Sequence, residues 1–449
     1  MAALAAGLLA GLAALVWARP VTAAYLLIGV TPLVAGIDRG VAIPVLRPNE
    51  ALELVLGATL AVRWLVGLRA GQVPLGRPDA VEAAILLLAV TNSVTPLTTM
   101  AVRGQSITTD DLFYSLVLWK LAGVYLIVRS AVRSEREVRT CLLVSVAAAS
   151  LVAIVGILQG LDLLGVRGFL AQYYAQFGDA AAIITVPRGG STLSLPAATA
   201  DLMIMNLAVA TALWLRVRRF TVLYGTVVAL FVVATLAAGE FSSAIGLVLG
   251  IGTLALVTGS LALLGFFGLL GTAGAVAVWP VIAERLEGFS HASGMPVSWV
   301  GRLHNLQTYF WPELASPSNF LLGVRPSARV PVASQATGWV WIESGYTWLL
   351  WGGGVPLLAS FLFLTWAVAR RGWAVARDRQ DAIGAAGAAT LVGIVIVAVL
   401  MAFDPHVTYR GSADALFALI ALTAGAARRR PGRPAEDRED RSHIDGGRW

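Results

Sequence analysis

The sequence predicts an all-α fold: a polytopic transmembrane helical bundle of about 12–13 spans, with a large extracytoplasmic loop that contains short helices. Hydrophobic residues make up 57% of the 449 positions and charged residues only 13%, which is about half the charged fraction of a soluble globular domain. The mean hydropathy is +0.77. Charge-free runs of about 20 residues, the length that crosses a bilayer as a helix, recur throughout the chain.

Thirteen apolar segments are predicted to be spans. They lie near residues 2–17, 20–37, 51–68, 82–101, 112–129, 140–162, 196–215, 220–239, 241–257, 261–283, 342–369, 382–403 and 411–427. The first has no basic residue at its start and no clear cleavage site, so we expect a retained helix and not a signal peptide. Residues 241–283 would measure about 65 Å as one helix, twice the hydrocarbon thickness. This run must therefore fold back, most simply at Thr258, Gly259 and Ser260.

The distribution of arginines predicts the orientation. Alternate connections and the C-terminal tail carry 22 of the 32 arginines, and the other connections carry 10 over far more residues. Because cytoplasmic loops are enriched in basic residues, we expect the first set inside the cell and two long polar loops, residues 163–195 and 284–341, outside. The chain then divides into a bundle, residues 1–425, and a tail, residues 426–449, whose composition predicts a disordered cytoplasmic segment.

The sequence argues against several classes of activity. The net charge of +7 is explained by cytoplasmic loops, so we expect no nucleic acid partner. The single cysteine, Cys141, excludes an internal disulfide and a cysteine metal cluster. The sequence has no Walker-type phosphate loop and no HExxH motif. His291 and His304 have no acidic or cysteine companion at ligand spacing, so we expect no metal site and no cofactor.

Four arginines of the outer loops have no topological reason to be present. They are Arg188, Arg302, Arg325 and Arg329. A guanidinium group offers five donors in a fixed fork that matches phosphate oxygens, and it stays charged at any accessible pH. These arginines therefore favour a diphosphate held close to the membrane. The structural alternative is that they are solvated and pair with loop glutamates.

Residues 298–311 are predicted to form a short amphipathic helix that ends at Pro312. Its apolar face carries Trp299, Leu303, Leu306 and Phe310. Arg302 lies on the polar face, which can border an aqueous cleft if the helix lies at the membrane interface. A helix that packs for structural reasons alone is equally compatible with the pattern.

Two further residues are candidates for chemistry. Glu343 precedes a span, and burial beside an apolar wall would raise the pKa of its carboxyl, as a general base requires. It can also be a favourable acidic residue at a helix N-terminus. Lys120 lies within a span, where a charge is functional or paired with a carboxylate. His406, in a short outer loop, is expected to be solvated.

The order of these features resembles the O-antigen polymerase/ligase superfamily. The resemblance covers residues 185–354 and rests on four segments. They are 188–196 (RGGSTLSLP), 239–246 (GEFSSAIG), 301–324 (beginning GRLHNLQ and ending NFLLGV) and 343–354 (ESGYTWLLWGGG). It implies a metal-independent glycosyltransferase of the GT-C-like class in the bacterial cytoplasmic (inner) membrane. Such an enzyme moves a glycan from a polyprenyl-diphosphate carrier to a glycan or lipid acceptor on the outer face, in contact with membrane lipids.

The resemblance also implies roles for individual residues. Arg188 and Arg302 match family arginines that engage the diphosphate, and Glu343 is the candidate base, so these three are the expected catalytic residues. The expected substrate-binding residues are Arg325, Arg329, His304, Tyr346 and Lys120. Ligases of the superfamily carry a histidine where this chain has Glu343, which favours a polymerase.

Three alternatives remain open. One is ligase-type transfer to a lipid or protein acceptor. Another is a transporter or flippase for an anionic lipid-linked substrate, which would use the outer arginines and Lys120 equally well. The third is a glycosyltransferase that uses a polyprenyl monophosphate sugar. Such enzymes carry acidic residues in the first outer loop, where Asp38 and Glu50 are available.

Overall fold

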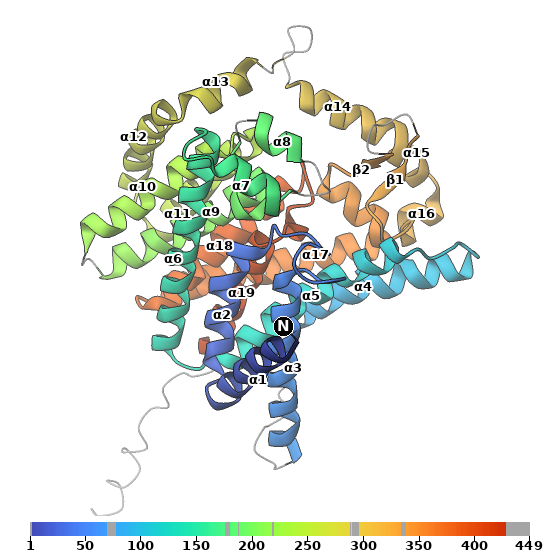
Figure 1. Ribbon diagram of the computed structural model, residues 1–449, viewed down its shortest axis with the longest axis horizontal. Helices are drawn as coiled ribbons and strands as arrows, with labels where there is room; N and C mark the ends of the chain where they lie inside the picture. Colours follow the sequence, from blue (N-terminus) through green and yellow to red (C-terminus); the bar gives the residue numbers. More distant parts are fainter. Residues whose placement is uncertain are drawn as a thin grey trace, which may run out of the picture.

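The computed structural model describes residues 2–69, 78–175, 180–186, 188–217, 220–287, 289, 296–333 and 338–427. The fold is all-α apart from one two-stranded antiparallel sheet, and it confirms the predicted class (Figure 1). The predicted tail, residues 426–449, lies outside the described residues except for its first two positions, which belong to the last helix. His291 also lies outside them.

Each of the thirteen predicted spans contains a helix, but the predicted number of membrane spans is higher than the number of helices long and apolar enough to cross a membrane. These helices are α1 (Ala2–Ala18), α2 (Val21–Val34), α3 (Pro48–Arg69), α4 (Ala80–Val102), α5 (Thr109–Ala131), α6 (Glu135–Gly160), α9 (Pro196–Val217), α10 (Thr221–Ala237), α11 (Phe241–Thr258), α12 (Ala262–Ala277), α17 (Gly345–Asp378), α18 (Ala382–Leu400) and α19 (Ser412–Ala427). Within the described residues, eight of them are long and apolar enough to cross a membrane, and a ninth span results if α12 and the helix that follows it count as one. The chain is therefore a multi-pass membrane protein.

Shorter elements occupy the connections. They are α7 (Val166–Tyr173), α8 (Ala180–Thr185), η2 (Ser191–Leu193), α13 (Trp279–Glu287), α14 (Val297–Asn305), η3 (Leu306–Phe310), α15 (Trp311–Leu314), α16 (Pro317–Leu322), β1 (Arg329–Pro331), β2 (Trp339–Trp341) and η4 (His406–Thr408). Figure 1 shows α13 and α14 along one edge of the molecule, beyond α7 and α8. Helices thus form more than half of the described residues of the two long polar loops.

Local sequence signals explain several helix ends. Three helices begin with a capping box, in which a side chain and a backbone N–H at each position bond reciprocally. The pairs are Asp79 with Glu82 in α4, Thr108 with Asp111 in α5, and Ser134 with Glu137 in α6. The predicted turn between α11 and α12 is confirmed, because Gly259 ends α11 at a φ of 68°. Glycine adopts this left-handed conformation without steric cost.

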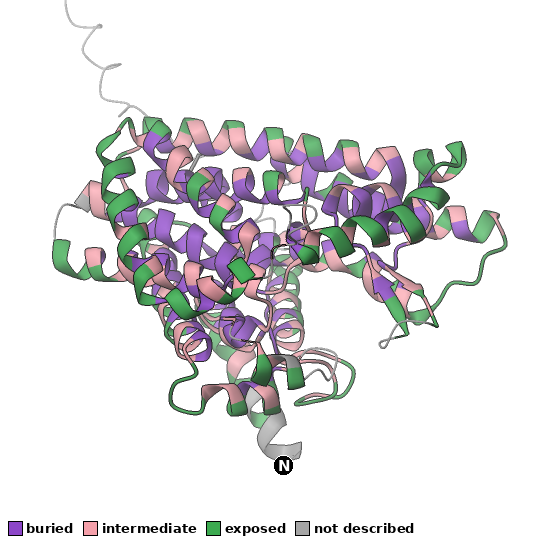
Figure 2. Cartoon of the chain, turned by 90° about the horizontal axis from the view of Figure 1, so that it is seen from above, coloured by how far each residue is buried: buried purple, intermediate pink, exposed green. Residues whose placement is uncertain are grey.

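The centre of the bundle is formed by α9 and α18. The apolar windows of these helices are 89% and 83% buried, whereas that of α3 is only 6% buried. Figure 2 shows the same contrast between buried inner helices and a largely exposed periphery. Because α3 touches the bundle through few residues, most of its surface faces whatever surrounds the protein. In a bilayer that surrounding is lipid.

The predicted helix at 298–311 forms, but its end and its buried face differ from the prediction. The helical path runs from α14 through a π-helical turn at 306–310 into α15, and Pro312 lies in the first turn of α15 instead of ending the pattern. A proline is tolerated there because the first N–H groups of a helix need no helical partner. Phe310 is fully buried, while Leu303 is 40% exposed. The inward face therefore includes Arg302 in place of Leu303.

Gly354 allows a sharp break within α17. Its φ is 65° and its ψ is −156°, a combination that essentially only glycine adopts. A Cβ atom at this position would lie 2.3 Å from the backbone oxygen of Leu321. The break lets α16 pack against the first part of α17, which directly follows Glu343 and Ser344.

We expect Gly354→Ala to lower the free energy of unfolding by about 2 kcal/mol or more, because strained backbone and a steric clash add. The apparent melting temperature of the purified protein in detergent measures the effect. Gly268→Ala in α12 is the matched control, since no atom lies within 4 Å of its added Cβ. Equal melting temperatures of the two variants would contradict the role of Gly354.

Candidate functional site

A cavity of about 1310 Å³ lies between α3, α5 and the outer loops. One wall is mostly apolar and is formed by two helices, although Glu53 of α3 and Lys120 of α5 also line it. From α3 it takes Leu54, Gly57, Ala58, Ala61 and Trp64, and from α5 it takes Leu116, Trp119, Leu126 and Ile127. Leu54 and Leu116 are more than half exposed. This wall therefore faces the hydrocarbon region of a surrounding bilayer as well as the cavity.

The other part of the lining is rich in ionisable groups. Arg47 and Glu50 lie at the N-terminal end of α3, whereas Trp64 lies 14 residues further along the helix. At 1.5 Å per residue, the apolar wall extends about 20 Å from the charged end. A cavity of this kind suits an amphiphile with a charged head group and a long hydrocarbon chain.

Arg302, Glu343 and Asp404 form the first group of charges, which we call the carboxylate site. The Arg302 guanidinium lies 3.3 Å from Glu343 Oε1 and 2.7 Å from Asp404 Oδ2. Burial raises the pKa of both carboxyls above their ordinary values, although the positive charge of Arg302 opposes this effect. One guanidinium thus holds two carboxyl groups that bind a proton more readily than exposed ones.

Close backbone packing brings these three residues together. Glu343 lies between β2 and the start of α17, and Asp404 lies in the loop between α18 and α19. Gly345 joins the two segments, because a Cβ atom there would lie 2.8 Å from the Asp404 backbone oxygen. The Tyr346 N–H also donates to the Met401 carbonyl at 3.2 Å. A side chain at position 345 would therefore separate the two carboxyls.

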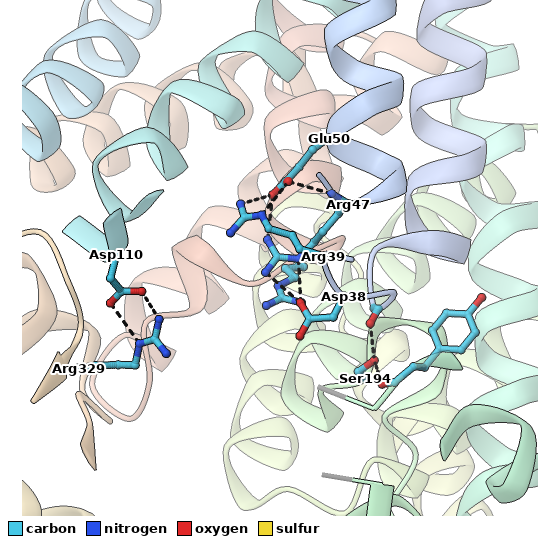
Figure 3. A network of polar contacts seen from close by, with 10 residues as sticks. Asp38, Arg39, Arg47, Glu50, Asp110, Ser194 and Arg329 are labelled. Carbon is cyan, nitrogen blue, oxygen red and sulfur yellow. Dashed lines mark hydrogen bonds and ion pairs between the residues drawn. The ribbon is translucent and has the colours of Figure 1, made fainter. Parts of the chain in front are cut away.

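A second group, which we call the arginine cluster, consists of Asp38, Arg39, Arg47 and Glu50, which Figure 3 labels, together with Arg410, which pairs with Asp38. Arg39 and Arg47 contact Glu50 at 2.7 and 2.8 Å. Arg47 and Arg410 both contact Asp38 at 3.2 Å. All except Asp38 line the cavity. Three guanidinium groups thus share two carboxylates at one end of the cavity.

The structure brings four of the eight predicted site residues to the cavity. They are Glu343, Arg302, Arg329 and Lys120. Arg329 pairs with Asp110, and its guanidinium lies 4.9 Å from the ring centres of both Trp339 and Trp341. Lys120 binds Asp414 at 2.7 Å, which is the carboxylate pairing that a charge within a span requires.

The other four predicted residues do not line the cavity. Arg188 pairs with Glu240 at 3.2 Å, and it is Glu240 that borders the cavity. Arg325 binds the fully buried Asp111 at 2.6 Å. The Tyr346 hydroxyl donates to the Ala398 carbonyl at 2.7 Å. His304 is exposed on α14.

The prediction that His406 is solvated is wrong. Its side chain is 1% exposed, and Nδ1 lies 2.7 Å from Asp201 Oδ2, which is equally buried. Asp201 lies on α9, 205 residues earlier in the chain. The pair ties the loop that carries Asp404 to the most buried helix of the bundle.

The sequence contains a signal for the charged residues of the site that were not predicted as site residues. Charged residues are dense at positions 38–50 and again at 404–410, and each short segment joins two apolar helices. Arginines and carboxylates this close to a bilayer must find partners because unpaired burial is costly. Within the part of the chain that the structure describes, no group of three or more His, Cys, Asp or Glu residues is arranged to hold a metal ion.

We expect Asp404→Asn to change how stability depends on pH. Because burial raises the pKa of Asp404, its stabilising contribution is complete below the ordinary pKa of about 4 and is lost as pH rises through the raised value. The melting temperature of the variant relative to wild type should therefore increase as pH rises above about 4. Glu313→Gln on an exposed helix is the control. A relative melting temperature that falls with pH would contradict the burial of Asp404.

In comparisons with known proteins, no family model, no curated protein and no solved structure matches this chain. The protein is a multi-pass helical membrane protein.

Proposed function

We propose that this protein is a membrane glycosyltransferase that transfers or polymerises glycan from a polyprenyl-diphosphate carrier on the outer face of the bacterial cytoplasmic membrane. One observation carries the proposal: a single cavity joins an apolar wall about 20 Å long to an end lined by arginines and carboxyls. The wall fits a polyprenyl chain, and the charged end fits a diphosphate and a reacting hydroxyl group.

The carboxylate site has the groups that such a transfer needs. In the reaction, the bond between the anomeric carbon and the diphosphate oxygen breaks, and the diphosphate leaves with the electron pair. The acceptor oxygen bonds to the anomeric carbon, and its proton passes to a carboxylate. Glu343 is the base in this scheme because its side chain is 32% exposed, whereas Asp404 is 13% exposed and holds Arg302 at 2.7 Å. Arg302 orients this carboxyl and opposes the effect of burial on its pKa.

Arginines that line the cavity stabilise the charge of the departing diphosphate, as fixed cations do in transfers of this kind. Glu343 stands where ligases of the superfamily that this chain resembles carry a histidine, so polymerase activity is favoured over ligase activity. Transfer to a lipid or protein acceptor is the closest alternative. A transporter for the same lipid is the second candidate, because Lys120 and Asp414 form an ion pair inside the helical bundle.

The test uses purified full-length protein with a polyprenyl-diphosphate-linked oligosaccharide. Wild type is expected to release the carrier and lengthen the glycan. Glu343→Gln should lower the turnover by 10²- to 10⁴-fold, the usual contribution of a general base, and should leave binding of the donor within threefold. Gln307→Ala, an exposed residue on the same outer segment, is the matched control and should retain wild-type turnover.

Two results would count against the proposal. If the Glu343→Gln variant turns over at the wild-type rate, Glu343 is not the general base. Transfer of chemically unchanged substrate across a vesicle membrane, without glycan lengthening, would favour the transporter.

A further inference from the structure

The charges of the cavity are unevenly distributed. Its lining contains six basic and six acidic side chains, so the lining as a whole has no formal net charge. The distribution then decides where an anion binds. The carboxylate site has one guanidinium between two carboxyls, and Lys120 has Asp414 beside it and Glu53 nearby. These two places have an excess of acidic groups.

Among the residues that the structure describes, the arginine cluster is the opposite case, with three guanidinium groups for two carboxylates. Arg188 and Arg285 also share one carboxylate, at 3.2 Å each, but only that carboxylate, Glu240, borders the cavity. Among the charged groups that line the cavity, the excess of positive charge is therefore at Arg39, Arg47 and Arg410.

The guanidinium groups of the arginine cluster are held by ion pairs and are partly buried. Burial, together with the positive charge of Arg47, lowers the pKa of Arg410 to about 10. The Arg39 guanidinium lies 4.3 Å from the centre of the Phe113 ring, and Arg47 has only 13% of its side chain exposed. Guanidinium groups held in place before binding lose little conformational entropy when a ligand arrives. An anion bound here would offset the repulsion among the three arginines.

The position of the arginine cluster on α3 orients the ligand. Arg47 immediately precedes α3, and the apolar wall continues along that helix and α5. We infer that Arg39, Arg47 and Arg410 bind the phosphate head group of an amphiphile whose hydrocarbon chain lies along α3 and α5. The carboxylate site then accepts the proton of the acceptor hydroxyl group. Naming the ligand a polyprenyl diphosphate rests on the proposed function, whereas the phosphate site itself does not. Arg188 and Arg302 then have no direct part in holding the head group.

The experiment measures binding to the full-length protein in phosphatidylcholine nanodiscs. The probes are undecaprenyl diphosphate, phosphatidylglycerol and the uncharged undecaprenol. Arg47→Gln and Arg410→Gln should each weaken binding of the phosphate-bearing probe by tenfold or more, since each loses a charge-assisted hydrogen bond. Undecaprenol binding should stay within threefold of wild type in both variants.

Glu50→Gln has the opposite expected sign. Glu50 competes with a phosphate for Arg39 and Arg47, so its neutralisation should tighten binding of the anionic probe severalfold. A variant that merely disturbs folding would weaken it instead, so this variant separates a binding role from a structural one. Arg167→Gln, an arginine in another loop that binds backbone carbonyls, is the control and should bind like wild type.

The outcomes separate this inference from the proposed function. Phosphatidylglycerol binding with the expected variant pattern, and no binding of undecaprenyl diphosphate, would support the phosphate site and contradict the proposed glycosyltransferase. The inference is overturned if wild type binds neither anionic probe. It is also overturned if Arg47→Gln and Arg410→Gln bind like wild type, or if Glu50→Gln weakens binding as they do.

Discussion

The pairing of guanidinium groups with carboxylates at the end of an apolar cavity is the interaction on which the rest of the site depends. Leaving an ion unpaired next to a hydrocarbon-facing wall costs several kcal/mol, so every basic side chain of the lining lies beside an acidic one. These pairs fix the loops 38–50 and 401–411 against the helices.

Pairing also sets what the cavity can bind. A phosphate that enters must replace a carboxylate as the partner of an arginine, so binding is an exchange and not a simple attraction. The exchange is easiest in the arginine cluster, where cations outnumber anions. It is hardest at Arg302, which already holds Glu343 and Asp404. The loop between α18 and α19 contributes Asp404 to one group and Arg410 to the other, so a change in that loop acts on both.

The sequence predicted the fold well because span length and apolar composition are local properties. The thirteen helices and the turn at Gly259 follow from them. Ion pairing is not local: Asp404 lies far from its partner Arg302 in the sequence, and Asp201 lies 205 residues from its partner His406. The outer arginines were predicted to bind phosphate from their residue type and loop position. In the structure, however, Arg325 is bound by Asp111 and Arg188 by Glu240. Arg39 and Arg47 were missed because the first outer loop was judged only by its carboxylates.

The most direct test of the amphiphile-binding cavity is an experimental density map of the full-length protein in nanodiscs with added undecaprenyl diphosphate. We expect density for the diphosphate within reach of Arg39, Arg47 and Arg410, and a continuous chain along α3 and α5 that leaves Glu343 accessible to an acceptor. Density for the lipid on another face of the bundle, with this cavity empty of it, would contradict both the site and the proposed orientation.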